Sequence, residues 1–204
     1  MSRNLIAILR SITPEESVEI AEALIEQGII RIEVPLNSPD PFESIGRMIE
    51  ALGSRAEIGA GTVLDVADVE RLAQLGARLV VSPNCDPDVI RATRQAGLES
   101  WPGVFTATEC FTALRAGATG LKLFPASLLG PEGVRALRAI LPPEAQLYAV
   151  GGVEAGNLAT WLNVGVTGFG LGSTLYAPGR PAADVSRAAA EIVAALRKGS
   201  VPHG

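Results

Sequence analysis

The chain repeats one pattern from end to end, in which a short apolar run is followed by an amphipathic segment. Several amphipathic segments begin with Pro, Asp or Thr and end at Gly, which are start and stop signals of helices. Alternating strands and helices predict a parallel sheet covered by helices. The predicted strands lie near Leu5–Leu9, Ile30–Pro35, Glu57–Ala60, Arg78–Ser82, Glu99–Trp101, Gly120–Phe124, Gln146–Val150 and Thr167–Leu171.

Eight strand–helix units in a chain of 204 residues predict an α/β fold, a single-domain (β/α)₈ TIM barrel over residues 1–204 with a frayed tail at about 199–204. The alternative is a doubly wound open sheet, which normally carries fewer units and a dinucleotide fingerprint. The run "GAGTVLD" lacks the third glycine of that fingerprint, and "GFGLGS" has the wrong spacing. The sequence therefore favours the barrel, and neither glycine motif is evidence for NAD.

Composition narrows the range of partners. The net charge is −5 and there is no basic cluster, which argues against nucleic acid. No apolar run is long enough for a membrane span, and the apolar run near the start is too short for a signal peptide. We expect a soluble cytoplasmic protein.

The single histidine, His203, is the penultimate residue, which argues against a Ser-His or Cys-His pair and against a zinc site built on histidines. Cys85 and Cys110 stand far apart without a CxxC pairing and are expected to be ordinary reduced thiols. Acid–base chemistry therefore falls to carboxylates, Tyr, Lys or water.

The segment "TGLKLFP" places Lys122 inside an apolar strand, although 15 of the 17 basic residues are arginine. A buried, unpaired ammonium tends to lose its proton, and lysine does so where arginine does not. A neutral amine is a nucleophile, so Lys122 is a candidate catalytic residue.

In a barrel of this type, functional residues lie where strands end and βα loops begin. Strand alternation places Glu33 on the face opposite Ile32 and Val34, and Lys122 on the face opposite its leucine neighbours. Glu33 and Lys122 are therefore expected to meet inside the barrel mouth. The alternative readings are a structural ion pair between the two, or a polar core residue at Glu33.

Further candidates lie at other strand ends. Arg10 ends the first strand, and it is either a ligand-binding group or a solvated strand end. The glycines of "VGGV" and "GLGS" leave bare backbone N–H groups after the last two strands, where many barrels hold a phosphate. Ser173 adds a hydroxyl donor there, although glycines in loops are punctuation by default.

The motifs "IAILRSITPEE", "EVPLNSP", "IGAGTV", "VSPN", "GLKLFPAS" and "AVGGV" resemble, in order and spacing, the 2-keto-3-deoxy-6-phosphogluconate/galactonate aldolase family, over roughly residues 5–198. The resemblance implies a class I, Schiff-base aldolase that needs no metal or organic cofactor and assembles as a homotrimer. The products would be pyruvate and D-glyceraldehyde 3-phosphate.

Residue by residue, the resemblance implies that Lys122 forms the Schiff base and Glu33 is the general acid/base. Arg10 and Thr62 would bind the pyruvyl carboxylate end, and Pro83 and Phe124 would wall the site. The phosphate end falls on Gly151, Gly152, Gly172 and Ser173.

The resemblance also indicates the 6-phosphogalactonate type of the family. Gluconate-type relatives carry a threonine before the two glycines that follow the seventh strand, where this chain has Val150. They also carry an arginine where this chain has Asn37. We therefore predict 2-keto-3-deoxy-6-phosphogalactonate as the better substrate, with Val150 as a selectivity residue and some activity on the gluconate epimer.

Two other functions remain open from the residues alone. An isomerase or epimerase of a sugar phosphate would share the glycines after the last strands but would not need Lys122. A catalytically silent barrel that binds an organic acid or phosphate would form no covalent adduct with pyruvate.

Overall fold

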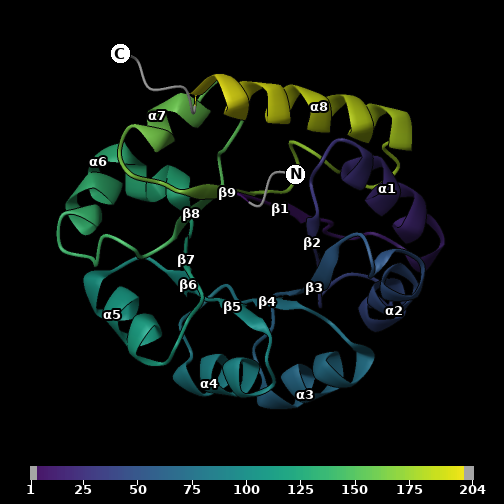
Figure 1. Cartoon of the computed structure of the whole chain (residues 1–204), viewed down its shortest axis with the longest axis horizontal. Helices are drawn as coiled ribbons and strands as arrows, with labels where there is room; N and C mark the ends of the chain where they lie inside the picture. Colours follow the sequence, from purple (N-terminus) through teal and green to yellow (C-terminus); the bar gives the residue numbers. More distant parts are fainter. Residues whose placement is uncertain (1–3, 200–204) are drawn as a thin grey trace.

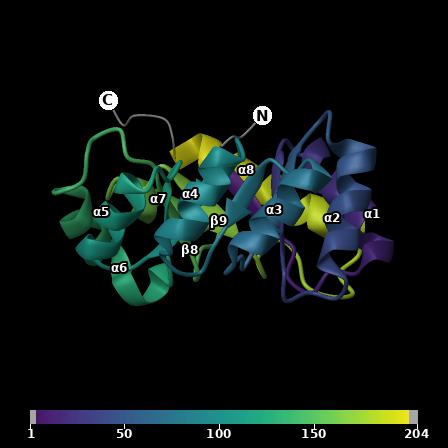
Figure 2. The same ribbon diagram turned by 90° about the horizontal axis from the view of Figure 1, so that it is seen from below.

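The computed structural model describes residues 4–199, so His203 and the predicted tail beyond residue 199 lie outside the described residues. Parallel strands line the centre, and helices surround them in chain order (Figure 1). Figure 2 shows the same ring turned by 90°. The strands are β1 (Leu5–Ile8), β2 (Arg31–Pro35), β3 (Glu57–Gly61), β4 (Leu79–Val81), β5 (Glu99–Trp101), β6 (Gly103–Val104), β7 (Leu121–Leu123), β8 (Leu147–Val150) and β9 (Gly168–Leu171).

The helices follow the strands, each βα unit bringing the chain back to the same end of the barrel. They are α1 (Pro14–Glu26), α2 (Pro41–Leu52), α3 (Val66–Leu75), α4 (Pro87–Gln95), α5 (Ala107–Arg115), α6 (Ala126–Arg138), α7 (Leu158–Leu162) and α8 (Ala182–Gly199). Local signals fix several starts: Thr13 and Thr106 form capping boxes with Glu16 and Glu109. The predicted barrel is confirmed, and the open doubly wound sheet is wrong.

One predicted strand is split by a proline. The strand order is β5-β4-β3-β2-β1-β9-β8-β7-β6, and only Pro102 separates β5 from β6. β5 pairs with β4, whereas β6 pairs with β7. Because proline has no N–H for a ladder, the hydrogen-bond pattern breaks there, and the chain itself joins the two edges. β5 and β6 together thus occupy one of the eight strand positions that the barrel was expected to have.

Two apolar clusters make up the core of the protein. The larger lies between strands and helices and includes Ile32, Val34, Leu121 and Leu123. The smaller lies inside the strands and consists of Ile6, Leu79, Val81, Trp101 and Tyr148. The strand alternation read from the sequence is therefore confirmed for β2 and β7.

Glycines make room for the large interior side chains. A Cβ at Gly120 would overlap the Trp101 ring, and a Cβ at Gly168 would overlap the Tyr148 ring. The two rings pack against each other with centroids 4.3 Å apart. Aromatic bulk on one strand is thus matched by a bare backbone on a neighbouring one.

Candidate active site

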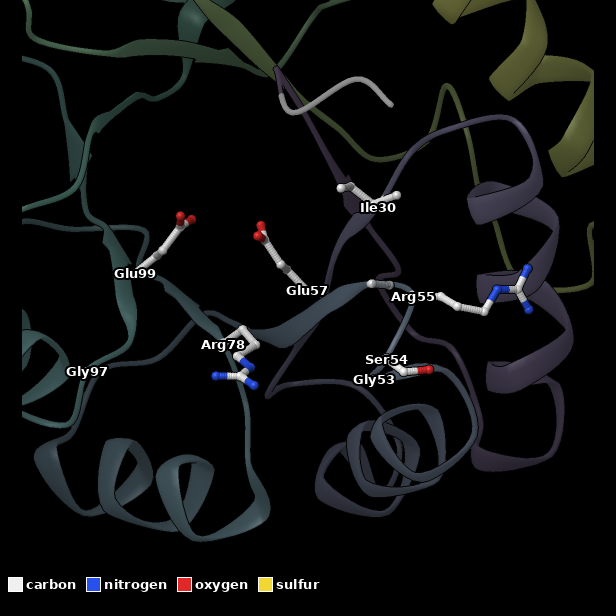
Figure 3. A pocket seen from close by; sticks show the side chains of 9 residues that line it. Ile30, Gly53, Ser54, Arg55, Glu57, Arg78, Gly97 and Glu99 are labelled. Atoms are coloured by element: carbon white, nitrogen blue, oxygen red, sulfur yellow. The ribbon is translucent and has the colours of Figure 1, made fainter.

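Two cavities lie at opposite ends of the barrel. The one at the amino ends of the strands has a volume of about 420 Å³, and its lining includes Glu57, Glu99 and Arg78 (Figure 3). In that view the two carboxylates point towards each other. Buried Arg31 binds both, at 2.7 Å to Glu57 and 2.8 Å to Glu99. The charge of Arg31 is therefore paired with those of Glu57 and Glu99.

The cavity at the carboxyl ends has a volume of about 410 Å³ and contains eight of the eleven predicted site residues. These are Arg10, Lys122, Phe124, Val150, Gly151, Gly152, Gly172 and Ser173. A smaller cavity of about 10 Å³ adjoins it, and both Glu33 and Lys122 line it together with Val150. The geometry thus brings together nine predicted residues from β1, β2, β7, β8, β9 and the loops that follow them.

Lys122 is buried in the middle of β7, with 7% of its surface exposed, whereas the other lysine, Lys198, is exposed. Its Nζ lies 4.7 Å from the centroid of the Phe124 ring. Burial lowers the pKa of the Lys122 ammonium; nearby Glu33 opposes that shift and Arg10 adds to it. The amine is therefore poised to lose its proton.

Glu33 is 2% exposed, and its Oε2 atom is buried without a hydrogen-bond partner within residues 4–199. Burial raises the pKa of Glu33 to about 7, although Lys122 and Arg10 pull it down. The carboxylate fits beside bare backbone, because a Cβ at Gly61 would overlap it. A carboxyl group with a pKa near neutrality can both accept and return a proton.

Arg10 is exposed at the end of β1, and its Nη1 donates a hydrogen bond to Asn37 Oδ1 at 2.9 Å. Asn37, the residue at which this chain differs from gluconate-type relatives, therefore contacts Arg10. Thr62 and Pro83 follow β3 and β4 at the same end of the barrel but line neither cavity there. Thr62 has a left-handed backbone, with φ of 56°, which is unusual for a β-branched residue.

The sequence reading missed several residues of this site. Thr174 and Tyr176 line the larger cavity, just beyond the predicted Ser173. The Tyr176 hydroxyl donates to Glu16 Oε1 at 2.9 Å. Gly61, which makes the space for Glu33, was not among the predicted site residues. Their proximity to predicted residues was the available signal.

At the carboxyl ends of the strands, a buried lysine lies near a buried carboxylate whose Oε2 atom has no hydrogen-bond partner among residues 4–199. This arrangement defines a class of enzyme site suited to carbonyl chemistry through an imine. The comparison with known proteins assigns the family. The family model "Aldolase: KDPG and KHG aldolase" matches residues 1–188, so the chain belongs to the KDPG and KHG aldolase family.

Named relatives are similar over nearly the whole chain. A probable 2-dehydro-3-deoxy-6-phosphogalactonate aldolase of Rhizobium meliloti (strain 1021) is 53% identical over 96% of this chain and 92% of its own length. The 2-dehydro-3-deoxy-6-phosphogalactonate aldolase of Escherichia coli (strain K12) is 47% identical over 95% of each. A solved structure titled "Native KDPGal structure" has a TM-score of 0.95 at 46% identity, covering 98% of this chain and 97% of that one.

Proposed function

We propose that this protein is a class I aldolase that cleaves 2-dehydro-3-deoxy-6-phosphogalactonate to pyruvate and D-glyceraldehyde 3-phosphate. The observation that carries the proposal is the buried Lys122 beside the buried Glu33, whose Oε2 atom has no hydrogen-bond partner in the described part of the chain, at the carboxyl ends of the strands. The names of the relatives that are 47% and 53% identical support the substrate.

Lys122 begins the reaction. Its neutral Nζ attacks the C2 ketone to give a carbinolamine, and loss of water leaves a protonated imine. The lowered pKa of Lys122 favours the neutral amine that this step needs. The Phe124 ring lies over the amine and forms part of the wall around it.

Glu33 moves the proton. Its carboxylate takes the proton of the C4 hydroxyl as the C3–C4 bond breaks, and the bonding electrons flow into the iminium to give an enamine. The aldehyde product then leaves. Glu33 returns the proton to C3, and water hydrolyses the resulting imine to release pyruvate and regenerate the amine. A pKa of about 7 suits both directions of this transfer.

The remaining predicted residues bind the substrate in this proposal. Arg10 and Thr62 hold the pyruvyl carboxylate, with Pro83 and Phe124 beside it. The phosphate meets Gly151, Gly152, Gly172 and Ser173, with backbone N–H groups as the main donors. Val150 lies next to Gly151 and lines both carboxyl-end cavities, which supports a role for it in substrate selectivity.

Borohydride trapping tests the function. Incubation with pyruvate and then borohydride is expected to leave a reduced pyruvyl adduct on Lys122, found by mass spectrometry of the intact protein and its peptides. Lys198→Met is the matched control and should keep the adduct, whereas Lys122→Met should lose it. An unmodified wild-type protein would favour a sugar-phosphate isomerase or a silent binder instead.

We also propose a homotrimer in the cytoplasm that uses no metal or organic cofactor. The family resemblance supports the trimer, and sedimentation of the purified protein tests it. The free thiols of Cys85 and Cys110 and the phosphorylated substrate support a reducing, intracellular compartment. Full activity after exhaustive treatment with a chelator is the expected result for the cofactor-free mechanism.

A further inference from the structure

The proposed phosphate end consists of two short segments, here called the glycine loops: Gly151–Gly152 after β8 and Gly172–Ser173 after β9. Gly151 and Gly152 are both left-handed, with φ of 96° and 74°. Glycine adopts this conformation easily but loses more conformational freedom than any other residue when it is fixed. Two adjacent glycines therefore need an external support to hold one shape.

The glycine loops offer unused donors. Within residues 4–199, the backbone N–H groups of Gly152, Ser173 and Thr174 donate to no protein acceptor, and all three residues line the cavity. Ser173 and Thr174 begin a turn in which Leu175 N–H donates to the Gly172 carbonyl at 2.8 Å. Free N–H groups at the start of such a turn suit an anion.

Asn157 supports the first loop from behind. Its Nδ2 donates to the Gly152 carbonyl at 2.9 Å, and its Oδ1 accepts from the Glu154 N–H at 3.1 Å. One amide side chain thus fixes both the second glycine and the chain that follows it. Asn157 itself does not line the carboxyl-end cavity.

Thr174 joins the two loops to each other. Its hydroxyl donates to the Val153 carbonyl at 2.9 Å, a bond between residues 21 positions apart. The guanidinium of Arg180 donates to the carbonyls of Thr174 and Leu175, at 3.1 and 2.8 Å, and so holds the far end of the same turn. The loops after β8 and β9 are therefore joined through the Thr174 side chain.

We propose that the Asn157 amide and the Thr174 hydroxyl are positioning groups that hold the glycine loops in their phosphate-binding form before phosphate arrives. The inference rests on the proposed function for the identity of the anion. Without these side chains, binding must also order the glycines, and that ordering weakens the affinity for the phosphate end. The pyruvyl end of the site, around Lys122, is unaffected.

The chain offers matched variants. Thr174→Val keeps the shape and removes the hydroxyl, whereas Thr174→Ser keeps the hydroxyl. Asn157→Leu removes both hydrogen bonds of the amide. We expect Thr174→Val and Asn157→Leu to raise KM for the phosphorylated substrate about three- to tenfold, the effect of one or two lost hydrogen bonds. Thr174→Ser should stay within twofold of wild type.

Two further readouts separate positioning from general damage. The pyruvate concentration that half-saturates borohydride trapping should not change in either variant, because pyruvate has no phosphate. The concentration of inorganic phosphate that raises the melting temperature by a fixed amount should rise about three- to tenfold. Equal losses at the pyruvyl end, or an unchanged phosphate response, would overturn the proposal.

The phosphate measurement needs no turnover, so it tests this inference even if the aldolase assignment fails. A wild type that forms no pyruvate adduct but shows the expected phosphate shift in the variants would sink the function and support the positioning role. If the wild type forms the adduct but the variants show no shift in KM or in phosphate response, the function would be supported and the positioning role refuted.

Discussion

Strand β2 carries a charge to each end of the barrel, and the two charges are treated in opposite ways. Arg31 and Glu33 lie two residues apart on the same strand face, and both are buried. Arg31 has two carboxylate partners and lies 3.3 Å from the Tyr148 hydroxyl, whereas the Oε2 atom of Glu33 has no hydrogen-bond partner among the described residues, 4–199. At the amino end, the buried charges satisfy one another through ion pairs. At the carboxyl end, burial shifts the pKa values of the charged groups.

This contrast separates stability from activity within one strand. A satisfied buried network holds neighbouring strands together, and removing one member leaves the others unpaired. An unsatisfied buried carboxylate destabilises the ionised fold but supplies a proton acceptor near neutral pH. Substitutions at the two ends are therefore expected to change different measured quantities.

The largest effect is expected at Lys122. Lys122→Arg keeps a positive charge but removes the amine that forms the imine, so kcat should fall by at least about 10⁴-fold with an intact fold. Steady-state kinetics and circular dichroism measure the two properties. A variant with more than about a tenth of the wild-type rate would refute the Schiff-base assignment.

The second-largest effect is expected for Glu33→Gln, which should lower activity and raise thermal stability. We expect kcat to fall by about 10²- to 10⁴-fold while the pyruvate adduct still forms, because Gln cannot carry the proton. The raised folded-state pKa means that ionised Glu33 destabilises the protein increasingly as pH rises from 4.5 to about 7. The variant should therefore melt higher than wild type at pH 8, with a difference that shrinks towards pH 5.

A variant that lost both the adduct and the fold would instead make Glu33 a structural partner of Lys122. Thermal unfolding at pH 5 and pH 8, with borohydride trapping on the same samples, distinguishes the two outcomes.

Arg31→Met tests the amino end. Glu57 and Glu99 would lose their shared cation, and we expect the free energy of unfolding to fall by about 3 kcal/mol. Denaturant unfolding measures this change. The rate of pyruvate adduct formation in the folded protein should stay within twofold of wild type.

Arg55→Met is the control for that substitution. Arg55 forms an ion pair with Glu22 in which both side chains are nearly half exposed, so its loss should change stability by less than about 1 kcal/mol. Equal losses from Arg31→Met and Arg55→Met would contradict the special role of the buried network.

The pH dependence of cleavage gives a more moderate effect. Because Glu33 must be ionised to take the C4 proton, kcat/KM should fall by at least about tenfold per pH unit below a pH of about 7. Protonation of the Lys122 amine in acid acts in the same direction, and the lowered pKa of Lys122 reduces that loss. A flat profile between pH 5 and pH 7 would argue against Glu33 as the base.

The smallest effect is expected in substrate selectivity. Val150→Thr adds a hydroxyl that can bind one C4 epimer, so the ratio of kcat/KM should shift about tenfold towards the gluconate form. Val150→Ala, which adds no donor, is the control. A wild-type preference for the gluconate epimer would refute the predicted selectivity and leave the aldolase assignment standing.

Patterns with a short period were readable from the sequence. Strand alternation placed Glu33 and Lys122 inside the barrel, because side chains on a strand alternate with a period of two. Because lysine is rare in this chain, its presence in an apolar strand identified Lys122 as a candidate catalytic residue. The break of the fifth strand at Pro102 was also open to prediction, since proline removes a ladder donor.

Long-range pairing was not readable. Arg31 meets Glu57 and Glu99, which lie 26 and 68 positions along the chain, and no local pattern specifies those partners. Asn157 and Thr174 look like ordinary loop residues until the fold brings their acceptors to them. Their roles depend on which backbone carbonyls lie nearby, which a single sequence does not encode locally.

The glycines under the interior rings have a consequence for how this chain can change over evolutionary time. Gly120 under Trp101 and Gly168 under Tyr148 leave no volume for even one methyl group. A larger residue at either glycine becomes tolerable only after its aromatic neighbour has shrunk, and the reverse order leaves a void. Each pair must therefore drift together, so homologous barrels should exchange bulk across neighbouring strands at these positions, one side chain growing where the other is lost.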